Sequence, residues 1–218
     1  GRGLKPQYVE IMKAHNIPQY YLDSCNLIKY MFPKGHAVAY VTQAIRVGYF
    51  KIYYPLEFYA TFFSKRSKQY DIRNMIKGRD AVISKLDELK LKNRSKTDKL
   101  SPKETEQLKT LNMALEMLQR GYSFANINLY KSDPVNFIVD YDNKCLIPPF
   151  ITLDGLGESN AVSVKEAREN GGKFLSREDL LRRTKLNGTN VEDLDSVGCL
   201  KGLGETDQMS LFEFGLDD

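Results

Sequence analysis

The sequence predicts a mainly α-helical protein with a small β element. Through most of the first 120 residues, apolar side chains recur at spacings of three and four, which is the period of a helix. Residues 122–147 instead hold short β-prone runs between turn residues. From Pro148 onward, turns marked by glycine separate further short helices. With 218 residues, 42% hydrophobic and 28% charged, the chain can form one large or two small domains.

Six helices are expected in the first 120 residues. Prolines set several of their limits, and Ser101 followed by Pro102 and Glu104 has the pattern of a capping box with proline at the first helical position. Gly78 could produce a kink, and the polar residues Lys92 to Lys99 form a loop. The expected helices are Leu4 to Asn16, Pro18 to Tyr30, Gly35 to about Tyr53, Pro55 to about Lys65, Ile72 to Asn93, and Pro102 to Arg120.

The expected β element lies in residues 122–147. Residues 126–130 (Asn-Ile-Asn-Leu-Tyr) and 136–140 (Asn-Phe-Ile-Val-Asp) read as short strands, and Asp142-Asn143 as a turn. Cys145 to Ile147 could add a third strand.

A first glycine hairpin is expected between Ile151 and Val162, with Gly155 and Gly157 between a short helix and a longer one. Glycine permits positive φ and close approach of a ligand to the backbone. The start of the following helix presents free N–H groups and the positive end of its dipole, which can hold a phosphate. Such a turn is also common as an ordinary helix connection, so alone it leaves both interpretations open.

A similar unit follows about thirty residues later. Ser176 is expected to cap a helix through Arg183, and Leu186-Asn187-Gly188 to turn into a helix from Thr189 that ends before Gly198. Two such units are the layout of a tandem helix-hairpin-helix domain, which follows the two backbones of a DNA duplex. The second hairpin could instead serve only as a packing partner.

The net charge of +4 conceals an asymmetry. Residues 1–128 carry 22 Lys and Arg against 11 Asp and Glu, whereas residues 129–218 carry 10 against 17. The basic half suits a polyanionic partner, although many of its lysines could simply solvate helix faces. In the acidic half, contact with DNA must be local, through oriented backbone groups.

Several classes of site find no support in the sequence. No apolar stretch is long enough to span a membrane, and no signal peptide or Met opens the chain, as expected for a piece of a longer protein. Cys25, Cys145 and Cys199 are too scattered for a usual zinc site and are expected to be buried. The pairs Asp140/Asp142 and Asp193/Asp195 are expected to be solvated rather than metal-binding.

The last dozen residues lack a pattern that would build a core. They contain Gln208-Met209-Ser210-Leu211-Phe212, a type of peptide that can anchor in an apolar groove of a partner. The same residues could instead pack as a strand or staple on the body of this chain.

Tyr30 to Tyr40 resembles the F-P-K-x-H-A-x-x-Y signature of bacterial DNA polymerase III α subunits, with Gly35 where family members commonly have Ala. Five further features are similar to the PolC type in particular. They are the runs Ala44 to Lys51, Tyr54 to Ala60 and Ile147 to Phe150, the tandem hairpins, and the peptide near the C-terminus.

This resemblance covers essentially the whole chain. It implies the C-terminal part of a DNA-directed DNA polymerase, from the distal fingers onward. The palm with its catalytic aspartates would lie upstream, so this piece would have no catalytic residue, bind no metal or cofactor and be inactive alone, while the whole enzyme uses Mg²⁺. The implied partners are a duplex DNA primer-template, the incoming dNTP, the sliding clamp (β subunit) and other replisome subunits, in the cytoplasm and without a membrane.

The resemblance also implies three sets of site residues. Lys34 and Arg46 could neutralise triphosphate charge, His36 could bind a phosphate or pack at the helix start, and Tyr40 could stack on a base or line the core. The implied nucleotide contacts are Lys34, His36, Tyr40, Arg46 and Lys51. The implied DNA-backbone contacts are Gly155, Leu156, Gly157, Glu158, Lys185, Asn187, Gly188 and Thr189. The implied clamp contacts are Gln208, Leu211 and Phe212.

The expected domains are a helical fingers region (1–121), a small β connector (122–147), the tandem helix-hairpin-helix domain (148–204) and a tail with the clamp peptide (205–218). Two alternatives remain. A stand-alone DNA-repair adaptor with a clamp peptide would use the hairpins but has no need of the fingers signature. A purely structural fragment would bind neither DNA nor the clamp.

Overall fold

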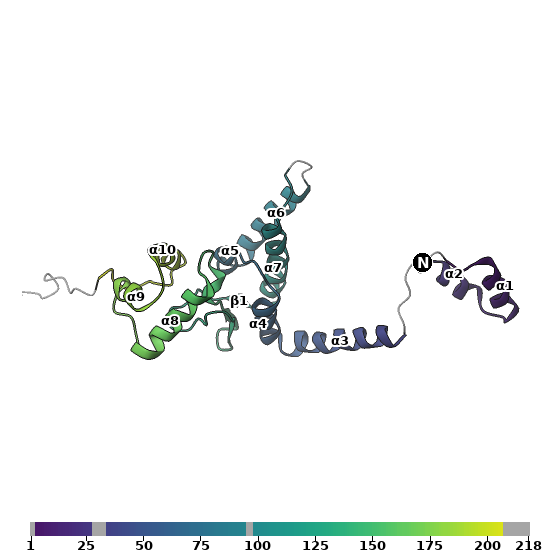
Figure 1. Cartoon of the computed structure of the whole chain (residues 1–218), viewed down its shortest axis with the longest axis horizontal. Coiled ribbons are helices and arrows are strands. Elements are labelled where there is room, and N and C mark those ends of the chain that lie inside the picture. Colours follow the sequence, from purple (N-terminus) through teal and green to yellow (C-terminus); the bar gives the residue numbers. More distant parts are fainter. Residues whose placement is uncertain (1–2, 28–33, 95–97, 207–218) are drawn as a thin grey trace, which may run out of the picture. The chain divides into compact units, whose positions relative to one another are not determined.

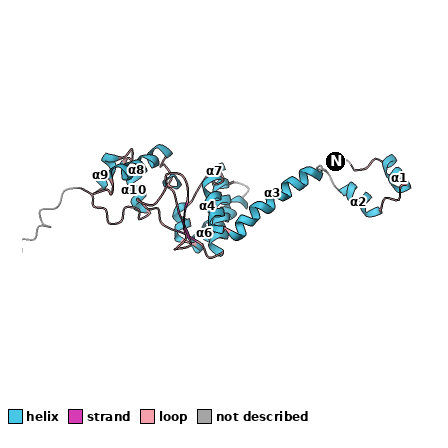
Figure 2. Cartoon of the chain, turned by 90° about the horizontal axis from the view of Figure 1, so that it is seen from below, coloured by secondary structure: helices cyan, strands magenta, loops and turns pink. Residues whose placement is uncertain are grey.

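Helices make up most of the protein. The computed structural model describes residues 3–27, 34–94 and 98–206 (Figure 1). The chain divides into two compact units, residues 1–52 and 53–218. Figure 2 shows that helices and loops account for nearly all of the described chain, as expected for a mainly α protein with a small sheet.

The first unit contains α1 (Pro6–Ala14), α2 (Gln19–Leu27) and most of α3 (Lys34–Tyr53). The Leu4 N–H donates to Oδ1 of Asn26 at 3.0 Å, which ties the entry of α1 to the end of α2. Leu22 is buried, whereas α3 buries none of its residues. These helices confirm the predicted ones, although the predicted end of the second helix, residues 28–30, lies outside the described residues.

The second unit begins with α4 (Pro55–Lys65), α5 (Ile72–Lys77), α6 (Arg79–Arg94) and α7 (Pro102–Gln119). The single helix predicted from Ile72 to Asn93 is wrong, because Gly78 has φ +97° and the chain breaks there into α5 and α6. The capping box of α7 is confirmed: Ser101 accepts from the Glu104 N–H, and the Glu104 carboxylate accepts from the Ser101 N–H. In Figure 1, α6 and α7 lie side by side as a helical hairpin.

An aromatic cluster forms the centre of the second unit. Phe63 of α4 is fully buried. The centroid of its ring lies 5.3 Å from that of Phe124, 5.4 Å from that of Phe137 and 6.4 Å from that of Tyr59. Contacts at these separations stabilise a core beyond simple burial. One hydrophobic cluster runs from Leu56 to Leu200, so the helices, the sheet and the hairpins share a core. The predicted domain boundaries inside this region stay predictions.

The sheet has the strand order β1-β3-β2, with β1 (Ser123–Phe124) parallel and β2 (Ile138–Asp140) antiparallel to β3 (Cys145–Ile147). The predicted strand at residues 126–130 is wrong. Oδ1 of Asn128 accepts from the N–H groups of Tyr130 and Lys131, so this backbone turns instead of pairing.

The strand predicted from residue 136 begins two residues later. The Asp133 carboxylate accepts from the Asn136 N–H, and Oγ of Ser64 accepts from the Phe137 N–H, which removes both groups from the sheet. The turn at Asp142-Asn143 and the third strand are confirmed.

The C-terminal half of the second unit contains the 3-10 helix η1 (Phe150–Thr152), α8 (Glu158–Gly171), α9 (Arg177–Arg183) and α10 (Gly188–Ser196). Cys145 is buried, and Cys25 and Cys199 are half-buried. Burial raises the pKa of the Cys199 thiol to about 12. Among the described residues, no helix has the length and apolar character that crossing a membrane requires.

Candidate nucleic-acid interface

The first hairpin joins η1 to α8. Gly155 has φ +81°, a left-handed conformation that a side chain would strain, and Gly157 has φ −71° as the N-cap of α8. Within the described residues, no acceptor is bonded to the N–H groups of Gly157, Glu158 and Ser159. The buried Leu156 differs, because its N–H donates to the Leu153 carbonyl at 3.2 Å. The helix start therefore leaves oriented donors at the surface.

The second hairpin joins α9 to α10. Ser176 caps α9 as expected, since its side chain accepts from the Asp179 N–H. Asn187 is the N-cap of α10, and its Oδ1 accepts from the Asn190 N–H at 2.9 Å. The N–H groups of Gly188 and Thr189 have no acceptor in the part of the chain that the structure describes. Two backbone donors therefore remain available at this turn.

The two hairpins are structurally equivalent around their N-caps. Gly157 and Asn187 each begin a helix, and each follows a buried leucine, Leu156 with 3% and Leu186 with 7% of its surface exposed. The second turn therefore has the same layout as the first.

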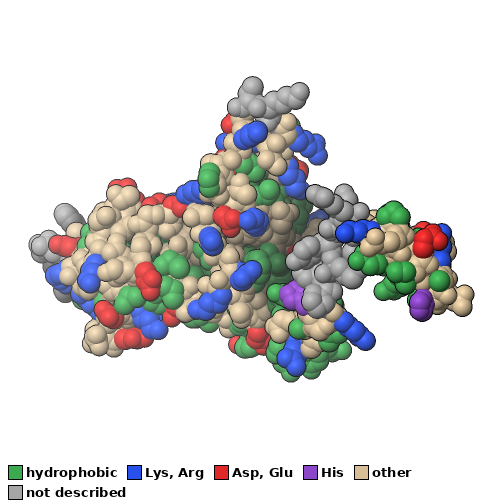
Figure 3. All heavy atoms as spheres, turned by 45° about the vertical axis from the view of Figure 1, so that its right-hand side comes forward, with side chains coloured by type: hydrophobic (Ala, Val, Ile, Leu, Met, Phe, Trp, Pro, Cys, Tyr) green, Lys and Arg blue, Asp and Glu red, His purple; other side chains and the backbone are tan. Residues whose placement is uncertain are grey.

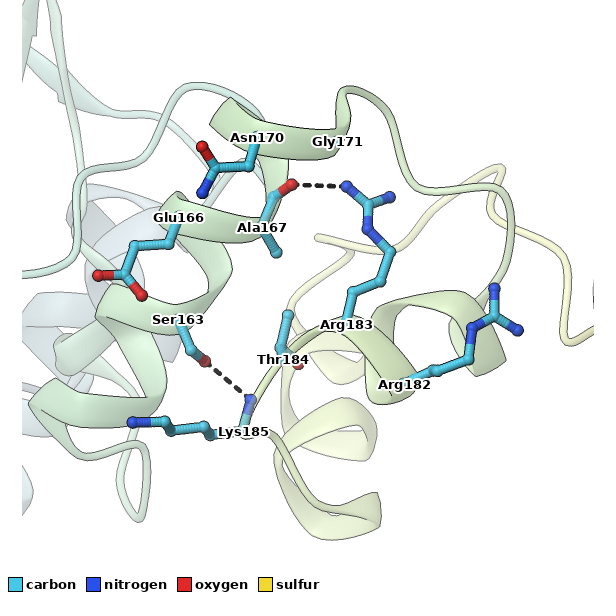
Figure 4. A pocket seen from close by; sticks show the side chains of 9 residues that line it. All are labelled: Ser163, Glu166, Ala167, Asn170, Gly171, Arg182, Arg183, Thr184 and Lys185. Atoms are coloured by element: carbon cyan, nitrogen blue, oxygen red, sulfur yellow. Dashed lines mark hydrogen bonds between the residues drawn. The ribbon is translucent and has the colours of Figure 1, made fainter.

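Asn190 braces the first hairpin against the second. Its Nδ2 donates to the Gly155 carbonyl at 3.3 Å, and its Oδ1 accepts from Nδ2 of Asn160 at 3.1 Å. Only 3% of the Asn190 surface is exposed, so its side chain is buried although its partners Gly155 and Asn160 are closer to the surface. A further contact joins Oγ of Ser163 on α8 to the Lys185 N–H at 2.9 Å (Figure 4). Together these hydrogen bonds fix the exposed N–H groups of the two turns in position relative to each other.

Arg183 ties α8 to α9 behind the second hairpin. Its guanidinium donates to the Ala167 carbonyl at 2.5 Å, as Figure 4 shows, and to the Asp179 carboxylate at 3.0 Å. Burial pushes the pKa of Asp179 up, but hydrogen bonds from the Leu175 N–H and from Arg183 outweigh it, so this pKa lies below its ordinary value. The side chain of Lys185 is exposed beside this contact, at the rim of a pocket between α8 and α9.

Charge around α10 is uneven. A surface pocket along its side is lined by Glu178, Glu192, Asp195 and Glu205, and Arg177 pairs there with Asp195 at 2.7 Å. An anion would be repelled from this side. On the face drawn in Figure 3, Lys and Arg are mixed with acidic side chains instead of forming one patch. Anion binding here must therefore rely on the local donors of the helix starts.

The carboxylate pairs have structural contacts. Asp193 is bonded to Arg73 of α5 at 2.7 Å, and Asp140 accepts from the Asn143 N–H in its turn at 3.0 Å. Asp193 and Asp195 are half-exposed surface side chains. In the described ranges, no group of three or more His, Cys, Asp or Glu is placed to hold a metal ion.

All five expected nucleotide contacts lie on α3. By the helical period, His36, Tyr40 and Lys51 share one face of this helix, whereas Lys34 and Arg46 lie on others. The ring centroids of His36 and Tyr40 are 4.3 Å apart. Tyr40 is 66% exposed, so it does not line a core of the described chain. The expected clamp residues Gln208, Leu211 and Phe212 lie outside the described residues.

Sequence reasoning missed the residues that position the hairpins, namely Asn160, Ser163, Arg183 and Asn190. The one available signal was Asn190 three residues after Asn187, a spacing that matches a capping box with asparagine at both ends. Nothing in the sequence indicated the contact from Asn190 to Gly155, because it joins segments 35 residues apart.

Comparison with known proteins agrees with this geometry. A family model described as "Helix-hairpin-helix motif" matches residues 121–209. The chain is 45% identical to a DNA polymerase III PolC-type of Oceanobacillus iheyensis and 46% identical to that of Bacillus subtilis, over 97% of this chain and 14% of each relative. The PolC-type protein of Clostridium perfringens is 42% identical over the same shares.

The chain thus spans about one seventh of the length of these relatives. The expected resemblance is confirmed over nearly every residue, and it includes the hairpins whose geometry is described above. The chain therefore corresponds, over nearly its whole length, to a segment of PolC-type DNA polymerase III proteins.

Proposed function

We propose that this chain is the part of a replicative DNA-directed DNA polymerase that grips duplex DNA through its two hairpins. Each hairpin would bind the phosphate backbone of one strand. The N–H groups of Gly157 and Glu158 would donate to one phosphate, and those of Gly188 and Thr189 to a phosphate of the other strand. Lys185 would add a cation at the second turn.

One observation carries this proposal: Asn190 holds the two helix starts together. Because its side chain contacts Gly155 and Asn160, the exposed donors of both turns form one rigid pair. A pair of phosphate sites at a constant separation suits a duplex, whose two backbones keep a constant spacing across the minor groove. Backbone donors read no base, so binding should be independent of sequence.

The test uses two glycine-to-alanine variants of the 218-residue chain. Gly157 and Gly188 lie outside the left-handed region, and a Cβ at either meets no atom within 4 Å, so Gly157→Ala and Gly188→Ala should fold normally. Each added methyl occupies the space through which a phosphate would approach. We expect both variants to lose roughly fivefold or more in affinity for duplex DNA, about 1 kcal/mol, as measured by fluorescence anisotropy.

Gly48→Ala on α3 is the matched control, because its Cβ also lies in open space. It should bind DNA like the wild type. Affinity should fall with rising salt and be equal for duplexes of unrelated sequence. Unchanged affinity in both hairpin variants would contradict the proposal.

Further roles follow from the family. We propose that Lys34, His36, Tyr40, Arg46 and Lys51 on α3 belong to the fingers and face the incoming dNTP. The carboxylates that hold Mg²⁺ for catalysis would lie on a part of the polymerase outside these residues, so the chain alone should not extend a primer. Primer extension by the purified chain would disprove that point.

We also propose that Gln208, Leu211 and Phe212 bind the sliding clamp, which would raise the local concentration of the polymerase at the primer end. Calorimetry with the clamp tests this against the double variant Leu211→Ala/Phe212→Ala. Binding by the wild type that is lost in the variant supports the role, and absence of wild-type binding contradicts it. A stand-alone repair adaptor would explain the hairpins, but not a similarity to PolC that extends over 97% of the chain.

A further inference from the structure

The loop between α4 and α5 forms one wall of a surface pocket whose other wall is the first hairpin. Ser67, Lys68 and Gln69 line one side, and residues 154–157 line the other, around about 460 Å³. These two segments are far apart in the sequence and meet only because both cover the core shared by the second unit.

The first hairpin lacks a cation of its own. In the second hairpin, Lys185 stands immediately before the buried Leu186, and the equivalent position before Leu156 is Gly155. The charged side chains next to the first turn are those of Asp154 and Glu158, which would repel a phosphate. A phosphate held by the N–H groups of this turn therefore needs positive charge from another segment.

Two lysines approach this turn from elsewhere in the fold. Nζ of Lys103 on α7 lies 2.9 Å from the carboxylate of Asp154, so its charge offsets that acid. Lys68 is exposed at the pocket, and among the described residues no hydrogen bond holds its ammonium group. Lys68 is therefore the lysine of the pocket wall that forms no ion pair within the described ranges, although its charge also acts on the Glu106 carboxylate.

Ser67 supplies a second, independent observation. Its Oγ is buried, and it has no hydrogen-bond partner within the described ranges. A buried hydroxyl without a partner destabilises the fold, which is uncommon unless the group serves another purpose. Ser67 lies at the same pocket as the unbonded N–H of Gly157.

We infer that Lys68 and Ser67 complete a phosphate site at the first hairpin, so that the α4–α5 loop binds the backbone of duplex DNA together with Gly157 and Glu158. This inference rests on the proposed function. It makes the DNA-binding surface composite: the second turn carries its cation in its own sequence, and the first turn receives one from the helical region before the sheet.

The test compares Lys68→Gln with Lys90→Gln in the 218-residue chain. Lys90 is an exposed lysine of α6, so its substitution removes the same charge away from the hairpins. We expect Lys68→Gln to weaken duplex binding roughly three- to tenfold and to reduce the slope of log K against log salt by about 0.9, the effect of one lost phosphate contact. Lys90→Gln should change neither quantity, and Lys68→Arg should retain wild-type affinity.

Ser67→Ala provides a second readout. Because this hydroxyl has no hydrogen-bond partner among the described residues, the variant should be at least as stable to urea as the wild type and yet bind DNA more weakly. Inorganic phosphate, titrated at constant ionic strength, separates duplex DNA from a free anion as the ligand. Loss of phosphate binding in Lys68→Gln with unchanged duplex affinity would overturn the assignment to DNA.

The outcomes also separate this inference from the proposed function. If Gly157→Ala weakens duplex binding but Lys68→Gln behaves like Lys90→Gln, the hairpins bind DNA and the inference about the loop is wrong. If the wild-type chain does not bind duplex DNA, both are wrong.

Discussion

Nδ2 of Asn190 in α10 donates to the carbonyl oxygen of Gly155 in the first hairpin at 3.3 Å. This contact makes the tandem hairpins one structural body. The partner oxygen belongs to the glycine with φ +81°, so the bond also holds the left-handed residue of the first turn in place. Loss of this one side chain should therefore affect both the stability of the fold and the spacing of its two anion-binding turns.

Asn190→Ala tests this relationship. The substitution removes a buried side chain and the hydrogen bonds that it makes to the Gly155 carbonyl and the Asn160 amide, which should lower the free energy of unfolding by about 1–3 kcal/mol. Urea titration measures the loss, and anisotropy should show weaker duplex binding. Asn112→Ala is the control, because that exposed amide bonds only within α7, and an equal loss in both variants would contradict a bracing role.

Substitution by alanine should change the stability of the fold differently at the two glycines of the first turn. Gly155→Ala places a side chain in the left-handed region and should lower the free energy of unfolding by about 1–2 kcal/mol. Gly157→Ala, at φ −71°, should leave it nearly unchanged. Thermal unfolding of the two variants side by side checks this, and equal stability would show that the turn relaxes without strain.

Phe63 is the residue whose truncation should damage the fold most. It is fully buried among Tyr59, Phe124 and Phe137, so Phe63→Ala should cost about 3–5 kcal/mol of unfolding free energy through lost burial and a cavity. Leu91→Ala on α6 is the control, because Leu91 is 72% exposed and its truncation should change stability little. Chemical denaturation of both variants makes the comparison.

The cap of α7 should make stability depend on pH in the acid range. A hydrogen bond from Lys92 and another from the Ser101 N–H lower the pKa of Glu104 to about 2, below the value near 4.3 expected in the unfolded chain. A carboxylate with a depressed pKa stabilises the fold above its unfolded value, and this contribution is lost as the pH falls toward the folded value.

The stability difference between wild type and Glu104→Gln should therefore be present at pH 7 and shrink progressively below about pH 4.5. Urea unfolding at pH 7, 5, 4 and 3 measures it. Glu88→Gln, which removes an exposed partner of Lys85, is the matched control. A difference that stays constant down to pH 3 would rule out ionised Glu104 as its source.

Local signals predicted most of the helices. Pro55 and Pro102 mark helix starts because proline suits the first turn, and the Ser101 cap contacts a residue only three positions away. Gly155 was equally visible, because a turn with left-handed backbone selects glycine wherever the chain later packs. Each of these signals depends only on residues that lie within a few positions of one another in the sequence.

The failures occurred where a distant or side-chain partner competes for the backbone. Residues 126–130 have the composition of a strand, yet Asn128 turns them away from the sheet. The N–H of Phe137 bonds to Ser64 of α4 instead of to a neighbouring strand. Strand propensity describes residue types alone, so it detects neither the local turn at Asn128 nor the contact with Ser64, which only the tertiary fold brings close.

The sequence by itself determined the helical class, the two hairpins and the relationship to PolC, since each depends on residue types in a short order along the chain. Only the tertiary structure decided that Asn190 braces the first hairpin and that Lys68 lies beside it. Those contacts join segments 35 and about ninety residues apart, and the packing of the shared core alone sets which segments meet.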